Sequence, residues 1–526
     1  MVVSIECSEM ETLINVEEYS HSMEMKVRIL DLDAGGKTIV VLNEQDARDL
    51  GVYSLDRVII TTEKDSLTAV VNTSDRFIPQ GQIAVFDEVR EGLCLTAGQD
   101  VQVLPRGGLQ SKRYIRRKVN GAELTAGEIE QIISDVVERN LNDLELASFI
   151  TALHMRGLSI AESTALIDAM VKTGSTLSFG KIACDKHSIG GVPGDKTSLL
   201  LVPVVAASGL TIPKTSSRAI TSPSGTADRA EMLMPVNLDI EEIEYTVKKT
   251  QGCLVWGGAL DLAPADDLLI QIEHPLGMDP LLLSSIISKK MSVGATHVVI
   301  DLPTGYRAKM KTVEDAQRLS RQFINLGTNV SMKIHCAITF GEQPIGHNIG
   351  PALEAREALE MLYRYEVSDL TEKVTSLAGI LLHMAGKATS KRQGKIMAEK
   401  ILKTKALSKM KQIIEAQGGD PRLKPEDIPV GEYCVSVTTE RKGVVRWINN
   451  KELVRIASAA GCPKDTGAGI RLMKKLGDTV QAGDTLLEIR ADKSSKLSQA
   501  ERLAQQYPLM GIIERWDRAM ILHTVA

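Results

Sequence analysis

The chain has 526 residues, enough for about two to four domains, with 43% hydrophobic and 25% charged residues, as in ordinary globular proteins. Its formal net charge of −5 and its 3% aromatic content exclude a general attraction to nucleic acid or to a membrane surface. The seven cysteines are scattered without a CxxC pair, and no apolar run reaches the length of about 18 residues typical of a membrane span. We therefore expect a cytoplasmic protein without a disulfide framework.

Residues 1–108 are predicted to form a small β-rich barrel domain. The segments MKVRILDL, KTIVVL, DRVIITT and SLTAVVNT have the alternating or β-branched apolar residues of strands. Between the second and third segments, Asn43 is expected to cap a short helix that ends at Gly51. The basic run KRYIRRK (112–118) is interpreted as a solvated linker or a strand at a domain contact.

Helical patterns characterise residues 112–180. Thr125 with Glu128, and Ser159 with Glu162, form capping boxes that precede apolar residues at helical spacing. Gly174 stands where the second of these helices is expected to end. We expect a small helical domain, with a further contribution from about 255–295.

Residues 183–420 alternate short apolar strands with helices, which predicts an α/β domain with a largely parallel sheet. The strand candidates include HVVID (297–301) and KIHCAIT (333–339). Ligands of such sheets bind in the loops that follow the carboxyl ends of the strands. The basic segment 387–411 is predicted to be one helix with a solvated face.

Residues 430–526 return to strands and turns. Within them, KLGDTVQAGDTLLEI (475–489) resembles the hairpin of a barrel-sandwich hybrid domain. The predicted fold class is therefore a multidomain α/β and α+β protein that ends in a barrel-sandwich-like α+β domain.

Two hydroxyl-rich loops flank an apolar helix within residues 184–231. Their glycines let backbone N–H groups approach a ligand closely, and a helix N-terminus favours anions. Hydroxyls and a lysine complete a cradle for phosphate. A Walker A loop would join Gly194 directly to Lys196, but Asp195 separates them and would repel a triphosphate. This argues for a phosphate-handling enzyme other than an ATPase.

The loop sequences KHSIGGVPGDKTS and SSRAITSPSGTADRAE closely resemble the paired signature of the thymidine phosphorylase family. They are more distantly similar to anthranilate phosphoribosyltransferase. The resemblance extends over residues 120–500 and implies a helical domain and an α/β domain with the active site between them. It also implies that inorganic phosphate is held by Lys186, Ser188, Ser198, Ser216 and Thr226.

The base-recognition segment departs from the pyrimidine phosphorylases, which use the arginine of an LRD motif. Here GGALDLAPADD has Asp261 in that place, followed by Ser285, Lys289 and Lys290. The extra segment IEHPLGMDPLLLSS and the N-terminal β-domain resemble the archaeal AMP phosphorylases instead. That family, a group of pentosyltransferases, converts a nucleoside 5′-monophosphate and phosphate into free base and ribose 1,5-bisphosphate.

This second resemblance implies that Asp279 is the proton donor. The implied AMP-binding residues are Gly191, Ser217, Arg218, Ala219, Ile220, Thr221, Ser222, Thr226, Ser285 and Lys309. Protonation of the base at N7 neutralises the leaving group, which is work suited to a carboxylic acid. The reaction needs no metal, and we expect no cofactor. The expected partners are AMP and inorganic phosphate, with CMP and UMP as further substrates, and a second copy of the chain in a homodimer or larger homo-oligomer; we expect no nucleic acid or membrane partner.

Each of these residues also has a purely structural interpretation. Asp279 could be the N-cap of the next helix, Arg218 a member of a structural ion pair, and Lys309 a solvated lysine. His187, between two residues assigned to the cradle, could be a packed histidine. The other functions left open are a phosphorylase of unphosphorylated nucleosides, a phosphoribosyltransferase, and a nucleotide-sensing assembly protein.

Overall fold

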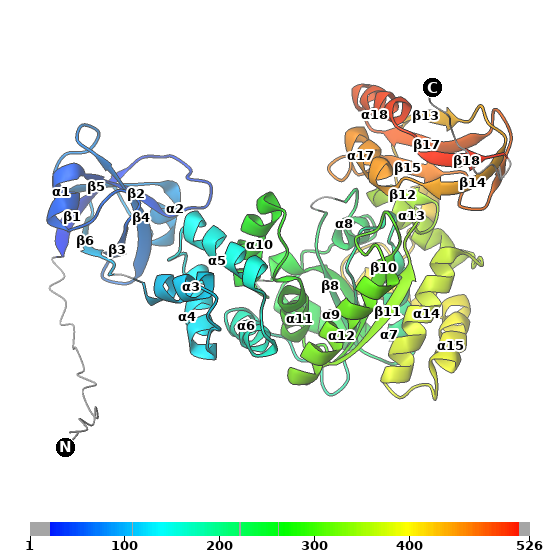
Figure 1. Ribbon diagram of the computed structural model, residues 1–526, viewed down its shortest axis with the longest axis horizontal. Coiled ribbons are helices and arrows are strands. Elements are labelled where there is room, and N and C mark those ends of the chain that lie inside the picture. The colour runs from blue at the N-terminus through cyan, green and yellow to red at the C-terminus, as the bar shows by residue number, and fades with distance from the viewer. Residues whose placement is uncertain (1–21, 108, 220–221, 261, 515–526) are drawn as a thin grey trace, which may run out of the picture. The chain divides into compact units, whose positions relative to one another are not determined.

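The computed structural model describes residues 22–107, 109–219, 222–260 and 262–514, which form two compact units (Figure 1). The first unit comprises the chain up to Leu124 together with Ser134–Ala152. The second comprises Thr125–Ile133 and the chain from Leu153 onward. Within the described ranges, no helix is both long and apolar enough to cross a membrane.

The first unit contains the predicted barrel, which is closed in the order β1-β5-β2-β4-β3-β6. The pairs β1–β5 and β2–β4 are parallel and the other pairs are antiparallel. Asn43 caps the first helix by accepting the Gln45 N–H, and Gly51 follows it at a φ of +70°, both as predicted. The elements are β1 (Met23–Ile29), β2 (Ile39–Asn43), α1 (Glu44–Asp49), β3 (Arg57–Thr61), β4 (Ser66–Ser74), β5 (Gln82–Val85), α2 (Asp87–Gly92) and β6 (Asp100–Pro105).

The basic run 112–118 is neither a linker nor a strand, because it lies within the helix α3 (Gln110–Val119). Ile115 is buried on one side of this helix, and the last turn is basic, where cations interact favourably with the helix dipole. Lys112 of α3 and Arg57 of the barrel both pair with Glu145 of α5 (Asp143–Arg156), at 2.9 and 2.7 Å.

Both predicted capping boxes are present. The Thr125 N–H donates to Glu128 at 2.9 Å at the start of α4 (Ala126–Val137). Ser159 and Glu162 cap α6 (Ile160–Lys172) reciprocally, and this helix ends at Thr173, directly before Gly174. α11 (Leu282–Ser292) and α10 (Pro264–Leu276) pack against α6, so these two helices of the segment 255–295 lie in the same helical layer as α6.

The α/β part of the second unit contains two parallel sheets, of order β11-β10-β7 and β8-β9. A parallel bridge between Ala183 and Thr211 joins their neighbouring edges, so the carboxyl ends of all five strands lie at one edge. α7 is apolar on every side, and Leu199–Ala206 are buried between the sheets and the helices α14 and α16. The elements are β7 (Cys184–Ser188), α7 (Thr197–Ala207), β8 (Ile212–Ser216), α8 (Thr226–Glu231), α9 (Ile240–Thr250), β9 (Gly252–Trp256), β10 (His297–Thr304), α12 (Val313–Asn329), β11 (Lys333–Phe340), α13 (Pro351–Tyr363) and α14 (Asp369–Met384).

The basic segment 387–411 forms parts of two helices rather than one. α15 (Lys391–Thr404) ends at Lys405, whose φ of −129° is not helical, and α16 (Ala406–Ala416) begins there. Ala398, Ile401 and Leu402 of α15 are buried while its lysines are exposed or half-buried, as predicted for a solvated face, which also includes the exposed Ile396.

The C-terminal part has two sheets, β12-β15-β17-β13 and β16-β14-β18, in agreement with the predicted sandwich (Figure 1). The interpretation of 475–489 as a hairpin is wrong, because its strands β16 and β17 pair into different sheets. The Lys475 ammonium donates to the Gly346 carbonyl at 2.6 Å and thereby anchors this part to the α/β part. The elements are β12 (Asn348–Ile349), β13 (Tyr433–Thr438), β14 (Gly443–Ile448), α17 (Asn450–Ala460), β15 (Gly469–Leu472), β16 (Thr479–Val480), β17 (Thr485–Ala491), α18 (Ser494–Gln506) and β18 (Met510–Ile513).

Candidate active site

The loops that follow β7 and β10 are in direct contact at the carboxyl edge of the sheet. Gly191, at a φ of +88°, lies so close to Lys309 that a Cβ there would be 2.6 Å from the lysine backbone nitrogen. A side chain at position 191 would therefore displace the backbone of the β10 loop. The glycine of the predicted phosphate loop and the predicted nucleotide-binding lysine are thus brought together.

The loop after β8 is organised by Asp228 of α8. The Asp228 carboxylate accepts the N–H groups of Ala219 and Gly225, each at 2.8 Å. A Cβ at Gly225 would lie 2.6 Å from the Ser217 carbonyl oxygen, so the loop folds back tightly on itself. Because the Ala219 N–H is already bonded to Asp228, this residue of the predicted AMP-binding run contributes mainly to the shape of the loop.

Arg229 of α8 connects the two predicted loops. Its guanidinium donates to the Ser224 carbonyl at 2.6 Å and to the Asp195 carbonyl, and it pairs with Glu354 of α13 at 3.1 Å. The sequence-based interpretation did not include Arg229, although it lies inside the quoted second loop. Ser222 is exposed, and its hydroxyl donates to the Ser224 carbonyl at 3.3 Å.

Four of the five residues predicted to hold phosphate lie at strand ends or helix starts, and Lys186 lies in the middle of β7. Ser188 and Ser216 end β7 and β8, where the Ser188 hydroxyl accepts the Gly190 N–H at 3.4 Å and the Ser216 hydroxyl donates to the Val255 carbonyl at 3.2 Å. Thr226 opens α8 and is half-buried. Ser198, in the first turn of α7, is 2% exposed and Lys186 is 3% exposed. The first three residues are therefore better placed for direct contact with a ligand than the last two.

Asp195, which we expected to repel anions, is neutralised in the structure. Its carboxylate lies 3.2 Å from the Lys186 ammonium and accepts the Thr197 N–H at 3.3 Å. Burial alone would raise the pKa of Asp195, but Lys186, Lys373 and Arg229 hold it well below its ordinary value. The loop therefore contains a fixed ion pair rather than a free negative charge.

Lys196, the lysine that a Walker A loop would need, points into the protein interior. It is fully buried, and its ammonium contacts Glu357 at 2.5 Å and the Ile345 carbonyl at 2.8 Å. A lysine whose ammonium is held by these buried groups cannot donate to a nucleoside triphosphate. The structure thus agrees with the argument against an ATPase.

A second layer of buried charge lies beneath the strand ends. Asp185 is fully buried and pairs with Lys290 at 2.7 Å and with Lys214 at 3.5 Å. Burial lowers the pKa of Lys214 to about 7, although Asp185 opposes the shift. Burial, together with Lys290 and Lys214, also lowers the pKa of His187 well below its ordinary value, so this imidazole is neutral.

Arg218 takes part in a structural ion pair, one of the two interpretations left open. Its guanidinium contacts both carboxylate oxygens of Glu231, at 2.6 and 2.8 Å, and lies 5.0 Å from the centre of the Trp256 ring. The hydrogen bond from Arg218 lowers the pKa of Glu231. In this structure the arginine fastens the loop after β8 to α8 and β9.

Asp279 lies in the connection between α10 and α11, and its carboxylate is 2.7 Å from the Lys309 ammonium. The side chains of Asp279 and Lys309 are 45% and 41% exposed. Asp279 is not the N-cap of α11, because the cap position is Leu281. The structure therefore brings the predicted proton donor to the loop that touches Gly191.

Glu273 of α10 is a further carboxyl group near this site that the sequence-based interpretation missed. It is 5% exposed, and it accepts the Leu281 N–H at 3.2 Å. Burial, followed by the charges of Asp279 and Asp266, raises the pKa of Glu273 to about 8. The sequence does contain a signal for Glu273. Asp266 and Glu273 are seven residues apart, which places both side chains on one face of α10.

Ser285 of α11 donates its hydroxyl proton to Asp266 at 2.8 Å, and Lys289 pairs with the same carboxylate at 2.7 Å. The predicted nucleotide-binding serine is thus already engaged with α10. Ile220 and Thr221 of the predicted AMP-binding run, and Asp261, lie outside the described residues.

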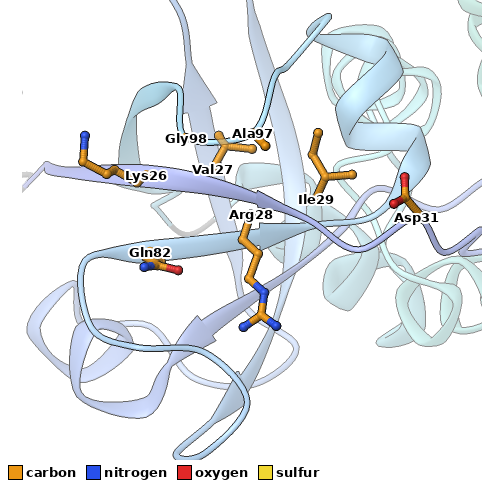
Figure 2. Close-up of a pocket in the computed structure, with 8 residues that line it drawn as sticks. All are labelled: Lys26, Val27, Arg28, Ile29, Asp31, Gln82, Ala97 and Gly98. Carbon is orange, nitrogen blue, oxygen red and sulfur yellow. The ribbon is translucent and has the colours of Figure 1, made fainter.

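A separate pocket lies on the surface of the barrel and is lined by residues of β1, β5 and the turn before β6 (Figure 2). Its two cations are already engaged, since Lys26 pairs with Asp100 at 2.9 Å and Arg28 donates to the Phe77 carbonyl at 3.0 Å. The pocket contains no acid–base pair comparable with Asp279 and Lys309. We therefore place the candidate active site at the sheet edge of the second unit.

The chain matches the models of four known domains. The glycosyl transferase family helical bundle domain matches residues 112–174, and the a/b domain of the same family matches residues 180–406. The pyrimidine nucleoside phosphorylase C-terminal domain matches residues 444–509, and the molydopterin dinucleotide binding domain matches residues 12–106.

Two relatives and one solved structure show how far the similarity extends. An AMP phosphorylase of Thermococcus kodakarensis is 47% identical over 92% of this chain and 97% of its own length. An AMP phosphorylase of Thermofilum pendens is 44% identical over 96% and 98%. An anthranilate phosphoribosyltransferase of Thermus thermophilus superposes with a TM-score of 0.50 over 58% of this chain and 98% of its own, and at 18% identity it shows the fold alone.

Proposed function

The chain belongs to the AMP phosphorylase family, and we propose that it is a pentosyltransferase that cleaves AMP with inorganic phosphate. The products would be adenine and ribose 1,5-bisphosphate. The observation that carries this proposal is that Lys309 pairs with Asp279 through its side chain and packs against Gly191 through its backbone. An acid and a cation therefore lie beside the glycine loop.

In the proposed reaction, phosphate binds at the strand ends through Ser188, Ser216 and Thr226, with Lys186 and Ser198 beneath them. A phosphate oxygen attacks C1′ as the bond from C1′ to the base nitrogen breaks. Asp279 gives a proton to N7 of the leaving adenine and is reprotonated from solvent, while the attacking HPO₄²⁻ loses its proton to solvent, so charge and protons balance over a turnover. General acid catalysis of this kind contributes about 10²–10⁴-fold, and fixed orientation of the two substrates supplies much of the rest.

The nucleotide in this proposal lies over Gly191, against the loop Ser217–Ser222 and Thr226, and between Ser285 and Lys309. CMP and UMP are proposed as further substrates, and the active form as a homodimer or larger homo-oligomer. The proposed domains are the barrel (1–108), the helical domain (112–180 with about 255–295), the α/β domain (183–420) and the C-terminal domain (430–526).

The test is to incubate the purified protein with inorganic phosphate and either AMP or adenosine, and to quantify adenine and the phosphorylated sugar. We expect adenine and a ribose bisphosphate from AMP in equal amounts. Adenine from adenosine alone would instead identify a nucleoside phosphorylase. Absence of adenine from both substrates would contradict an enzymatic role of this kind and favour the sensor alternative.

A further inference from the structure

The loop that follows β10 is closed at its base and carries two basic side chains. The Gly305 N–H donates to the Met310 carbonyl at 2.9 Å, and the Ala308 N–H donates to the Gly305 carbonyl at 3.0 Å. Ala308 is buried, and its neighbours in the chain are Arg307 and Lys309. Because these bonds make the loop one short closed unit, a contact that holds Arg307 also restrains Lys309.

Arg307 stacks on an aromatic ring of the C-terminal part. Its guanidinium carbon lies 4.5 Å from the centre of the Trp447 ring of β14. Within the described part of the chain, the Arg307 Nη1 is buried and has no hydrogen-bond partner, so the ring rather than a bond to this nitrogen holds the guanidinium. The negative face of a tryptophan ring attracts a cation without any carboxylate, and more strongly where water is excluded.

Trp447 is itself fixed in place by the neighbouring strand β18. Trp447 pairs with Gly511, and a Cβ at position 511 would overlap the indole, so the ring lies directly over the glycine. The register of β14 against β18 also shifts between Val445 and Trp447, and such irregularities redirect a side chain. The ring that receives Arg307 is therefore part of the framework of this sheet.

A second contact, from the junction of β14 and α17, reaches the base of the β10 loop. Asn450, three residues after Trp447, donates its side-chain N–H to the Gly341 carbonyl at 3.0 Å. The Gly341 N–H donates in turn to the Thr304 carbonyl at 2.9 Å, and a Cβ at position 341 would lie 3.1 Å from the Ala308 Cβ. The C-terminal part thus supports this loop both at its base and at its arginine.

The other contact of this loop is with the candidate site, because the Lys309 backbone packs against Gly191. We propose that Trp447 and Arg307 are positioning residues: through them the C-terminal part holds the β10 loop where the nucleotide binds. This inference rests on the proposed function, and it gives the C-terminal part a role in binding AMP. The phosphate site should not depend on this support, because its proposed residues lie on β7, α7, β8 and α8.

The test is a double-mutant cycle of Arg307→Met, Trp447→Leu and the combined variant, with Trp447→Phe as the change that keeps an aromatic ring. Arg446→Met, at the exposed neighbour of Trp447 in β14, is the control. For each protein, kcat, KM for AMP and KM for phosphate are measured, and urea unfolding is recorded.

Either single variant should raise KM for AMP about tenfold, which is within the range of a partly desolvated cation–π contact. The combined variant should show the same rise as each single variant, because both changes remove one contact. KM for phosphate should stay unchanged. Trp447→Phe should lose much less affinity for AMP than Trp447→Leu does, and Arg446→Met should behave as the wild type does.

Three results would overturn the inference. An unchanged KM for AMP in Arg307→Met would show that the stacking does not position the loop, and this variant leaves the packing of the sandwich intact even if Trp447→Leu loosens it. Effects that add in the combined variant, or that raise both KM values equally, would mean that the two residues act independently or only stabilise the fold. If the wild-type protein releases no adenine from AMP, the proposed function fails and the inference fails with it. The wild-type measurement separates this last failure from the others.

Discussion

Replacing Glu273 with Gln should stabilise the protein at neutral pH, by an amount that grows as the pH rises. In the unfolded chain this carboxyl ionises near its ordinary pKa of 4.5, whereas in the folded protein burial raises the pKa to about 8. Between these two values the folded state keeps a proton that the unfolded state has lost. The contribution of Glu273 to the free energy of unfolding is therefore fully present at low pH, and it is lost as the pH rises from about 4.5 to about 8.

The magnitude follows from the size of the shift. Each pH unit in this window costs about 1.4 kcal/mol, so the cost at pH 7 is about 3 kcal/mol. Glutamine is neutral in both states, and its carbonyl can still accept the Leu281 N–H. The variant should therefore escape most of this cost at pH 7 and little of it at pH 5.

The assay is urea unfolding of the wild type and of Glu273→Gln at pH 5, 6, 7 and 8, with Glu244→Gln as the control at an exposed position of α9. The difference in unfolding free energy between Glu273→Gln and the wild type should increase across the series, and the control should show no such trend. A difference that is constant with pH, or that favours the wild type more strongly at pH 8, would refute the assignment of a neutral, buried Glu273.

Three further changes test the site. Asp279→Asn should lower turnover of AMP by about 10²–10⁴-fold and leave AMP affinity, measured by calorimetry, largely intact; unchanged turnover would remove Asp279 from the mechanism. Gly191→Ala should lower kcat/KM for AMP far more than Gly190→Ala. Both glycines have a positive φ, but only a side chain at position 191 would clash with Lys309. Equal losses in the two variants would show that backbone strain alone is responsible. Lys196→Met should destabilise the protein by about 3–5 kcal/mol in urea unfolding, since it leaves Glu357 buried without its cation, and Lys196→Met combined with Glu357→Gln should recover part of the loss.

The features that could be predicted from the sequence are those set by nearby residues. The capping boxes at Thr125 and Ser159 and the cap at Asn43 depend on side chains that meet the backbone within three residues, and all three are present. The parallel sheet followed from strands that alternate with helices. The run 112–118 was misinterpreted because its many charges suggest an exposed segment. The run is in fact part of a helix, one side of which buries Ile115.

The electrostatics of the site could not be predicted in the same way, because its partners are distant in sequence. Lys373 is one of the cations that hold Asp195 ionised, and it lies 178 positions further along the chain. The sequence suggests that the Asp195 carboxylate repels anions, because it does not show that the fold brings this carboxylate next to the Lys186 ammonium. Glu273 was missed because its burial depends on the packing of α10 and α11.

The arrangement of these charges separates groups that fix the site from groups that substrates can exchange. Breaking a buried pair such as Lys196 with Glu357 costs about 3–5 kcal/mol, whereas an exposed pair is worth about 0.2–1 kcal/mol. A bound phosphate can easily offset the cost of breaking an exposed pair. Breaking a buried pair would instead disrupt the fold. The exposed pair of Asp279 with Lys309 is therefore one that a substrate phosphate can exchange, whereas the buried pairs keep the loops in place.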